Sequence, residues 1–301
     1  MRRLRRRAST ADLKARLARY ELGWPPGHFY SPIPDLDEVR RHEDAIFPSA
    51  DEPMTGIDLR ERSQLALLRD LGAPCDEQLW ADQPRPGLRY GFDNPNFQRG
   101  EALVLLGLMC LRRPRRVIEI GSGWSSCALL DVNERFLEGQ AHCTFVEPYP
   151  ELLHELVHGE QLDIRAVRAQ DIGLDIFDEL GEDDMLIVDS THVAKAGSDV
   201  NRIVFEVLPR LAPGVLVHVH DVYHGFEYPR AWVYEGRAWN EAYVLRAFLM
   251  FNSAWEIVFF NSFMAARHAE AFASNLPRAA ESPGSSLWLR RGGTGVAGPA
   301  S

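Results

Sequence analysis

The chain has 301 residues, of which 46% are hydrophobic and 25% are charged, and its formal net charge is -10. This composition fits one large α/β domain, alone or with a smaller appendage, and a sizeable core. The acidic balance argues against a nucleic-acid partner, because phosphate binding needs Lys and Arg clustered on one face. The longest apolar stretch, residues 102–111, is too short to span a bilayer, so we expect no membrane insertion.

The cysteines and the N-terminus indicate the cellular compartment in which the protein is expected to work. The cysteines show no C-x-x-C spacing, and Cys110 and Cys127 stand in apolar runs where a thiol behaves as a small hydrophobe. We therefore expect a reduced, cytoplasmic setting. The basic residues 2–7 are not followed by the apolar core of an export signal, and a solvated terminus explains them better than a membrane or nucleic-acid arm. The four cysteines are Cys75, Cys110, Cys127 and Cys143.

The first 87 residues are rich in proline and charge, and only residues 59–71 are patterned as a helix. Because this segment has too little periodic apolar content for its own core, we expect an irregular N-terminal cap rather than an independent domain. The main domain is expected over residues 88–291. The remaining tail, residues 292–301, has a linker's composition and is expected to be disordered.

Strands and helices alternate after residue 95, which predicts a Rossmann-like, doubly wound α/β sheet with helices on both faces. The sheet is expected to be mostly parallel, with an antiparallel C-terminal hairpin, since no clear helix separates the last two strands. The expected strands are residues 117–120, 143–147, 164–167, 185–189, 215–221, 255–261 and 286–289. The expected helices are residues 98–111, 124–137, 151–158, 200–211 and 240–251.

A glycine turn joins the first of these strands to the next helix. Gly121 and Gly123 allow a tight turn and let a ligand approach the backbone. The dinucleotide pattern G-x-G-x-x-G fails, because Ser126 occupies the third glycine position. Glu119 stands two residues before the first glycine, where a carboxylate suits a cationic sulfonium ligand and repels phosphate.

Two further carboxylates follow the next strands. Glu147 ends the second strand, where it could accept hydrogen bonds from both hydroxyls of a ribose, and Asp171 follows the third, where it could face an adenine. Each of them alone could equally be a helix cap or a solvated strand end. Three carboxylates at successive strand ends are harder to dismiss, since open α/β sheets bind ligands at that edge.

One set of features stands together over roughly residues 95–291: residues 117–126, Glu147, Asp171, Asp189 and the two-stranded ending. This set resembles the class I S-adenosylmethionine-dependent methyltransferases. Residues 28–32, 56–59 and 90–95 also resemble bacterial methyltransferase-domain proteins of glycan and natural-product clusters. The resemblance implies that S-adenosylmethionine is bound by Glu119, Gly121, Gly123, Glu147 and Asp171.

Two polar segments, residues 189–192 and 218–224, follow the fourth and fifth expected strands and should meet at one sheet edge. Methyl transfer to a hydroxyl needs a base in line, because an alcohol is a poor nucleophile until its proton is leaving. We expect His192 to be this base, since the ordinary pKa of histidine, about 6.5, suits proton transfer near neutral pH. Asp189 and His220 complete the expected catalytic set.

These segments also resemble the metal-dependent catechol-type and macrolide-sugar O-methyltransferases. That resemblance implies that Asp189 and Asp221 hold Mg2+ or another divalent ion, and that a histidine of an Asp-x-x-His segment, here His192, acts as base. His220 departs from the pattern, because those families usually offer a carboxylate or amide at its position. A metal-free site and a transition ion that accepts imidazole both remain open.

The function predicted from these features is O-methylation of a small-molecule or glycan acceptor, with residues 1–87 covering the acceptor site. The aromatic run within residues 223–239 suits a ring-bearing acceptor. An NAD(P)-dependent oxidoreductase or epimerase would share the sheet and Glu147, but a pyrophosphate-compatible turn and a Tyr-x-x-x-Lys pair are missing. A non-catalytic, cofactor-binding scaffold is the other alternative, and a homo-oligomer is left open.

Overall fold

The structure is a computed structural model that describes residues 24–47, 49, 52–72 and 78–293. The basic start of the chain, Cys75 and residues 294–301 of the predicted tail lie outside these residues. The chain divides into two compact units. The first comprises Met1–Ile46 with Ala231–Ala238, and the second comprises Phe47–Arg230 with Trp239–Ser301.

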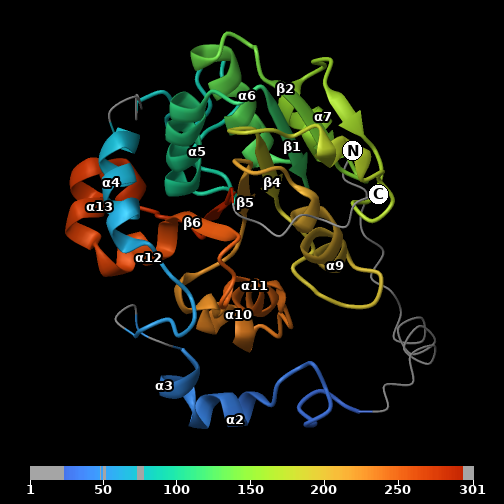
Figure 1. Cartoon of the computed structure of the whole chain (residues 1–301), viewed down its shortest axis with the longest axis vertical. Coiled ribbons are helices and arrows are strands. Elements are labelled where there is room, and N and C mark those ends of the chain that lie inside the picture. Colours follow the sequence, from blue (N-terminus) through green and yellow to red (C-terminus); the bar gives the residue numbers. More distant parts are fainter. Residues whose placement is uncertain (1–23, 48, 50–51, 73–77, 294–301) are drawn as a thin grey trace. The chain divides into compact units, whose positions relative to one another are not determined.

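A seven-stranded sheet forms the centre of the second unit, in the order β3-β2-β1-β4-β5-β7-β6 (Figure 1). All neighbouring strands from β3 to β5 are parallel, and β7 is antiparallel to both β5 and β6. The predicted fold class is confirmed. The strands are β1 (Arg116–Ile120), β2 (His142–Val146), β3 (Asp163–Arg165), β4 (Met185–Val188), β5 (Leu216–Val219), β6 (Trp255–Phe260) and β7 (Leu287–Arg291).

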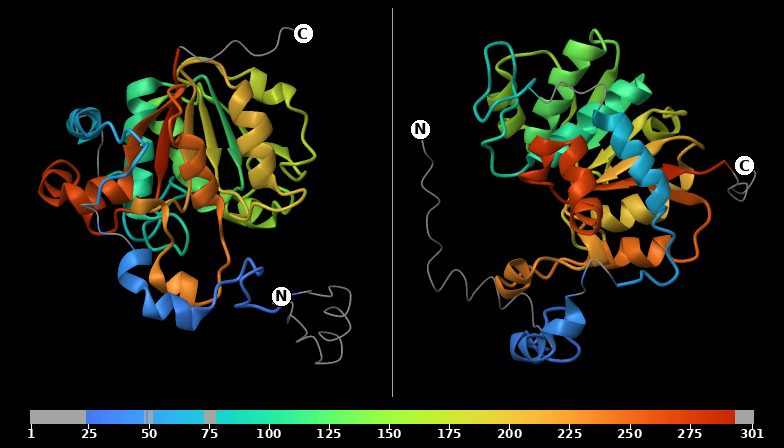
Figure 2. Two further views of the ribbon diagram at one scale, coloured as in Figure 1. Left: turned by 60° about the horizontal axis from the view of Figure 1, so that its bottom comes forward. Right: turned by 90° about the vertical axis from the view of Figure 1, so that its left-hand side faces the viewer.

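Helices lie on both sides of this sheet (Figure 2). Every residue of the central strands β4 and β5 is therefore buried; β4 is a continuous apolar run, and β5 is apolar except for the buried His218. No helix among the described residues is long and apolar enough to cross a bilayer. The helices of the second unit before β6 are α4 (Glu61–Gly72), α5 (Arg99–Arg112), α6 (Trp124–Phe136), α7 (Glu151–Val157), α8 (Asp175–Asp178), α9 (Asp199–Arg202) and α11 (Glu241–Leu249).

The predicted helix over residues 200–211 is present but irregular. After α9 it continues as a π-helical segment, η1 (Ile203–Val207), and then as a 3-10 turn, η2 (Leu208–Arg210). Pro209 lies within that last turn. Because proline has no backbone N–H and its ring crowds the preceding turn, the regular hydrogen-bond pattern changes here.

The connection between the last two strands differs from the prediction. β6 and β7 pair in antiparallel fashion as expected, but the chain between them forms three short helices rather than a direct turn. Phe272, Leu276 and Ala279 of this connection are fully buried. Helices this short show too few apolar repeats for a sequence pattern to reveal them. They are α12 (Asn261–Arg267), α13 (Ala269–Asn275) and α14 (Pro277–Ala280).

The first unit contains α2 (Leu36–Arg41) and α3 (Glu43–Ile46). Asp35 caps α2, since its side chain accepts a hydrogen bond from the backbone N–H of Asp37 at 2.8 Å. Tyr234, at the end of α10 (Arg230–Tyr234), donates a hydrogen bond to Glu43. The side chains of residues 231–238 and of the N-terminal helices thus form one structural unit, although they are far apart in sequence.

Helix α4 belongs to the second unit, although it lies within the segment predicted as a cap. Its Leu68 and Leu71 are fully buried. The side-chain oxygen of Gln64 accepts a hydrogen bond from the backbone N–H of Phe260 at 2.8 Å, at the end of the edge strand β6. Residues 61–72 therefore contribute to the core around the sheet.

The glycine turn after β1 joins three strand ends. Gly121 donates a backbone hydrogen bond to Val146 of β2 at 3.0 Å, and Asp189 donates one to Ile120 of β1 at 2.8 Å. Gly121 has a φ of +79°, and a Cβ there would overlap the carbonyl oxygen of Asp189. At Gly123, a Cβ would meet only Leu152, at 3.6 Å. Glycine is thus required at position 121 by the fold itself, and not at position 123.

Replacing each glycine by alanine should separate these roles. Gly121→Ala forces the ends of β1 and β4 apart, and we expect it to lower the free energy of unfolding by about 1–3 kcal/mol. Gly123→Ala should leave it within about 0.5 kcal/mol of the parent. Denaturant titration followed by circular dichroism measures both changes, and equal losses in the two variants would contradict the close approach seen here.

Two N-terminal truncations test where the second unit begins. A chain starting at Leu88 lacks α4 and exposes the partners of Leu68 and Leu71, each worth about 1.5–3 kcal/mol of burial. We expect this chain to melt well below the full-length protein. A chain starting at Phe47 retains α4 and should melt close to it. Thermal unfolding measures both, and a stable Leu88 chain would show that α4 is dispensable.

Candidate active site

Glu119 is buried at the end of β1 and is used by the helix that follows. Its carboxylate accepts hydrogen bonds from the hydroxyl groups of Ser125, at 2.6 Å, and Ser126. Burial raises the pKa of Glu119 to about 8. Among the described contacts, Glu119 therefore fixes the first turn of α6 against the glycine turn.

Glu147 lies at the end of β2 and connects the neighbouring loops. One carboxylate oxygen accepts the backbone N–H of Ser122 at 3.1 Å, and the other accepts that of Tyr149 at 2.7 Å. Each carboxylate oxygen can accept further bonds. The buried hydroxyl of Ser122 has no hydrogen-bond partner among the described residues. Glu147 and Ser122 can thus form further hydrogen bonds at the glycine turn. The space beside Gly123 lies at the same turn.

Asp171 lies in a different environment. It is exposed and forms a two-bond ion pair with Arg168, at 2.7 and 3.0 Å. The hydrogen bonds from Arg168 lower the pKa of this carboxyl group. Its described side-chain contacts do not connect it to the glycine turn.

The predicted catalytic residues meet at Asp189, directly after β4. Its Oδ1 atom lies 3.3 Å from Nε2 of His192 and 3.4 Å from Nδ1 of His220. Asp221, directly after β5, places Oδ2 3.7 Å from the same two nitrogen atoms. The four residues are called the reaction cluster below. Sequence reasoning correctly placed them together at the carboxyl ends of β4 and β5.

Two buried glutamates complete this arrangement and were not predicted. Oε2 of Glu241 lies 2.8 Å from Nδ1 of His192, and Oε1 of Glu101 lies 3.2 Å from Nε2 of His220. Glu101 and Glu241 are only 1% and 2% exposed. Each histidine of the reaction cluster is therefore held between an outer glutamate and the inner Asp189.

The pKa values follow from these contacts. Burial alone would lower the pKa of His192, but hydrogen bonds to Asp189 and Glu241 outweigh it and raise the pKa to about 9. Burial acts in the same way on His220, and the charges of Glu101 and Asp189 raise its pKa well above the usual value. Burial would raise the pKa of Asp189, but His220 and His192 hold it far below its usual range.

Backbone strain coincides with the reaction cluster. His192 has a φ of +59° and Asp221 has a φ of +56°, in the left-handed region that non-glycine residues seldom adopt, although Asp and His do so more often than most. The carbonyl oxygen of His192 accepts backbone hydrogen bonds from Asn240 and Glu241 at 3.0 and 3.1 Å. These bonds hold the strained loop after β4 against the start of α11. Strain of this kind is characteristic of functional sites.

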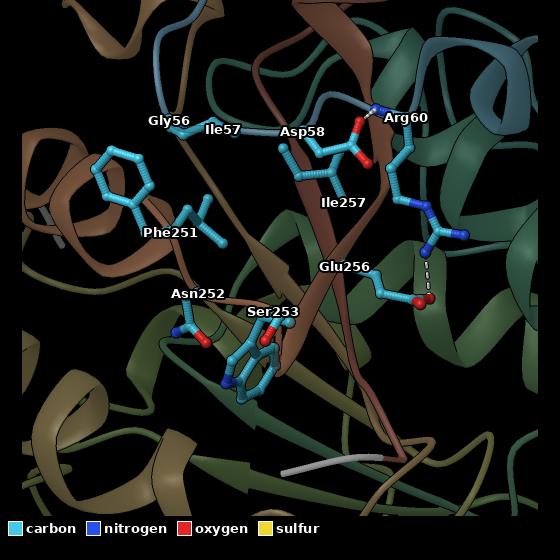
Figure 3. Close-up of a pocket in the computed structure, with 11 residues that line it drawn as sticks. Gly56, Ile57, Asp58, Arg60, Phe251, Asn252, Ser253, Glu256 and Ile257 are labelled. Carbon is cyan, nitrogen blue, oxygen red and sulfur yellow. Dashed lines mark hydrogen bonds and ion pairs between the residues drawn. The ribbon is translucent and has the colours of Figure 1, made fainter.

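A mainly apolar hollow of about 290 Å³ adjoins the loop after β5, and its walls include Phe47, Tyr223, His224 and Tyr228. The ring of Tyr228 lies 6.0 Å from that of Trp239, which lies 4.4 Å from the imidazole of His192. Neighbouring rings, packed edge-on and tilted, thus lead from this hollow to the reaction cluster. A larger cavity of about 520 Å³ lies between residues 56–60 and the start of β6, and none of the predicted site residues lines it (Figure 3).

Two solved structures show how far the likeness in fold extends. The S-adenosylhomocysteine-bound methyltransferase PaMTH1 of Podospora anserina is 14% identical, with a TM-score of 0.42, and the match covers 87% of this chain and 98% of that one. Human N-acetylserotonin methyltransferase, in complex with S-adenosylmethionine, is 12% identical, with a TM-score of 0.33 and coverage of 64% and 51%. Both likenesses are too distant to bear on the acceptor.

Sequence relationships identify the family. The family model described as a methyltransferase domain matches residues 118–222, which contain the glycine turn, Glu147 and the reaction cluster. An uncharacterised protein of Archaeoglobus fulgidus is 36% identical over 164 residues, which are 53% of this chain and 74% of that protein. With this kinship and a seven-stranded sheet whose β7 is antiparallel, the chain belongs to the class I S-adenosylmethionine-dependent methyltransferases.

Proposed function

We propose that this methyltransferase moves the methyl group of S-adenosylmethionine to a hydroxyl group of a small-molecule or glycan acceptor. The observation that carries the proposal is the reaction cluster, in which Glu241 supports the imidazole of His192 at the ends of β4 and β5. Hydroxyl acceptors need such a group, because the oxygen becomes nucleophilic only as its proton leaves. A positively charged sulfonium donor needs no electrophilic assistance from the protein.

The cofactor is proposed to lie at the glycine turn. Glu147 would accept the ribose hydroxyl groups with its remaining acceptor capacity, and the unpartnered hydroxyl of Ser122 would donate or accept a further bond. The backbone at Gly123 would pack against the ligand. Glu119 would act through its hold on Ser125 and Ser126, close to the sulfonium end of the cofactor. For Asp171, the adenine contact proposed from the sequence requires release from Arg168.

His192, in its neutral form, is proposed to accept the acceptor's proton in the protein without a metal ion; because Asp189 and Glu241 raise the pKa of His192 to about 9, this form is gained, and turnover should rise, as the pH approaches that value. Glu241 lies at Nδ1, so Nε2 is the nitrogen that faces the reaction cluster. A base that a buried carboxylate orients from behind is a recurrent arrangement in enzymes that activate hydroxyl groups. The ring of Trp239 lies 4.4 Å from the imidazole and covers one side of it.

A divalent ion, implied by the resemblance to metal-dependent O-methyltransferases, fits the same atoms. Asp189, His192 and His220 each offer one ligand atom, and these atoms lie within 4.8 Å of one another. Nδ1 of His220 is buried and has no hydrogen-bond partner of good geometry among the described residues. Bound there, an ion would lower the pKa of an acceptor hydroxyl as a Lewis acid. Asp221 contributes negative charge next to the site.

The acceptor is proposed to occupy the hollow beside Tyr223 and Tyr228. Aromatic side chains pack well on the faces of sugar and phenolic rings, and His224, Glu227 and Arg230 add polar groups to the lining of this hollow. The guanidinium of Arg230 lies over the ring of Phe47, 5.2 Å from its centre, at one wall. A ring-bearing acceptor with a free hydroxyl group therefore suits the chemistry of the reaction cluster and of the hollow.

The cofactor assignment is tested by Glu147→Ala. Loss of the carboxylate removes up to two hydrogen bonds to the ribose, each worth about 1.5–3 kcal/mol when the acceptor is charged. We expect S-adenosylmethionine affinity, measured by isothermal titration calorimetry, to fall by at least tenfold. Circular dichroism and the melting temperature show whether the fold is intact. Near-normal affinity in a folded Glu147→Ala protein would refute the ribose assignment.

The role of His192 is tested by His192→Ala with S-adenosylmethionine and a panel of phenolic and glycosidic acceptors. Turnover should fall by roughly 10²- to 10⁴-fold, while cofactor affinity stays close to that of the parent, because proton removal matters only during methyl transfer. His142→Ala, at an exposed histidine, is the matched control and should keep its turnover. Full turnover by His192→Ala would discard the reaction cluster as the catalytic centre.

A further inference from the structure

The two histidines of the reaction cluster are supported in the same way, and this symmetry carries an inference about the divalent ion, Mg2+ or another, that the sequence left open. We propose that Asp189, His192 and His220 bind a first-row transition ion in preference to Mg2+, and that Glu101 and Glu241 are the positioning residues that prepare both imidazoles for it. This proposal rests on the proposed function for the reaction that the ion would assist. Metal binding itself can be measured without any acceptor.

Glu101 is built into the fold at a fixed position. It lies in the first turn of α5, and its carboxylate accepts the backbone N–H groups of Gln98 at 2.7 Å and Ser285 at 3.0 Å. Gly284, with a φ of +78°, lies so close that a Cβ would overlap the side chain of Glu101. Two separate parts of the chain, the start of α5 and residues 284–285, therefore hold this carboxylate against His220.

Glu241 holds His192 from the opposite side. It is the first residue of α11, and its other oxygen accepts a hydrogen bond from the hydroxyl of Ser190 at 2.8 Å. The same hydroxyl accepts the backbone N–H of His192 at 2.9 Å. The ring and the backbone of His192 are thus both tied to the start of α11, which leaves the imidazole little freedom to rotate.

These contacts determine which nitrogen of each ring can bind a metal. An ionised carboxylate only accepts hydrogen bonds, so the nitrogen facing Glu101 or Glu241 carries the proton. The inner nitrogen atoms, Nδ1 of His220 and Nε2 of His192, face the carboxylate of Asp189, and an ion bound between them would displace their protons and take their lone pairs. The carboxylate–histidine–metal arrangement of metalloproteins has this form, with the outer carboxylate fixing the tautomer and the ring orientation.

The donor set decides the class of ion. Mg2+ prefers oxygen ligands and keeps several waters, whereas imidazole nitrogen favours Zn2+, Fe2+, Co2+ and their neighbours. The predicted pair Asp189 and Asp221 would have suited Mg2+. In the structure Oδ1 of Asp221 accepts a hydrogen bond from Ser285 at 3.0 Å and its Oδ2 lies 3.7 Å from the two inner nitrogen atoms, whereas Asp189 lies closer to them, at 3.3 and 3.4 Å, so two imidazole nitrogen atoms belong to the donor set in either case. With an ion bound, His192 is a ligand, and its role as base belongs to the ion-free protein.

The full-length chain, freed of metal with EDTA, provides the test, with Co2+ as the probe. We expect one Co2+ per chain by calorimetry and visible absorption bands typical of nitrogen coordination. A large excess of Mg2+ should not displace it. Zn2+ should displace it and should raise the melting temperature, because a ligand that binds only the folded state stabilises it.

Conservative variants then show whether Glu101 and Glu241 position the histidines for the metal or only stabilise the fold. Glu101→Gln and Glu241→Gln keep the size of the side chain but remove its charge, and each should weaken Co2+ binding by about 10- to 100-fold. Asp131→Asn is the matched control, because Asp131 is also fully buried but pairs with Trp80 and Arg89 outside the reaction cluster, and its Co2+ affinity should match the parent's. Melting temperatures of all three variants show that they are folded.

Two results would overturn the proposal: no saturable Co2+ binding by the folded chain, or Co2+ affinity unchanged in His192→Ala and His220→Ala. Mg2+ competing as strongly as Co2+ would overturn the choice of ion. A failure of metal binding can be told apart from a failure of the proposed methyl transfer. Methyl transfer to a hydroxyl acceptor that persists in EDTA would leave the O-methyltransferase standing without the ion, whereas tight Co2+ binding without any methyl transfer would leave the metal site standing alone.

Discussion

One carboxylate oxygen, Oδ1 of Asp189, lies between two imidazoles at the ends of the two central strands. His192, His220, Glu101 and Glu241 around it are buried, and buried charges are tolerated only when they are paired, because the interior solvates them poorly. The pairing extends outward from Asp189 through His192 and His220 to Glu241 and Glu101. The strained backbone of the loop after β4 and the packing of the first turns of α5 and α11 all serve this arrangement.

Asp189 also couples the reaction cluster to the glycine turn. Its backbone N–H donates to Ile120, and its carbonyl oxygen lies where a side chain at position 121 would be. The same residue therefore sets the spacing between the ends of β1 and β4 and carries the central carboxylate. The glycine turn, where the cofactor is proposed to bind, and the histidines of the reaction cluster are thus linked through one backbone contact.

The sheet and the position of the site could be predicted because they follow from local patterns. Apolar runs mark β1, β4 and β5, and polar residues directly after parallel strands share one edge by geometry. Glu101 could not be found this way, since an acidic residue in the first turn of a helix is ordinary and its partner His220 is 119 positions distant. Glu241, 49 positions from His192, was hidden for the same reason.

The three carboxylates that the sequence predicted to bind the cofactor together have different partners and different exposure in the structure. Glu119 is committed to two serine hydroxyl groups, Glu147 holds two backbone N–H groups, and Asp171 is paired with Arg168 at the surface. Each of them follows one of three successive strands in the sequence, but the three side chains differ in how deeply they are buried. Burial depends on which helix covers each strand end, and that information lies in tertiary packing rather than in the motif.

The contact between Gly284 and Glu101 has a consequence for the order in which the molecule is built. Ser285, whose backbone N–H holds Glu101, is separated from it by 184 positions and is followed by the last strand, β7. During synthesis, residues 101, 189, 192, 220 and 241 all leave the ribosome before this clamp exists. The hydrogen bond that fixes the carboxylate of Glu101 from this side is therefore complete only once the end of the chain has inserted between β5 and β6.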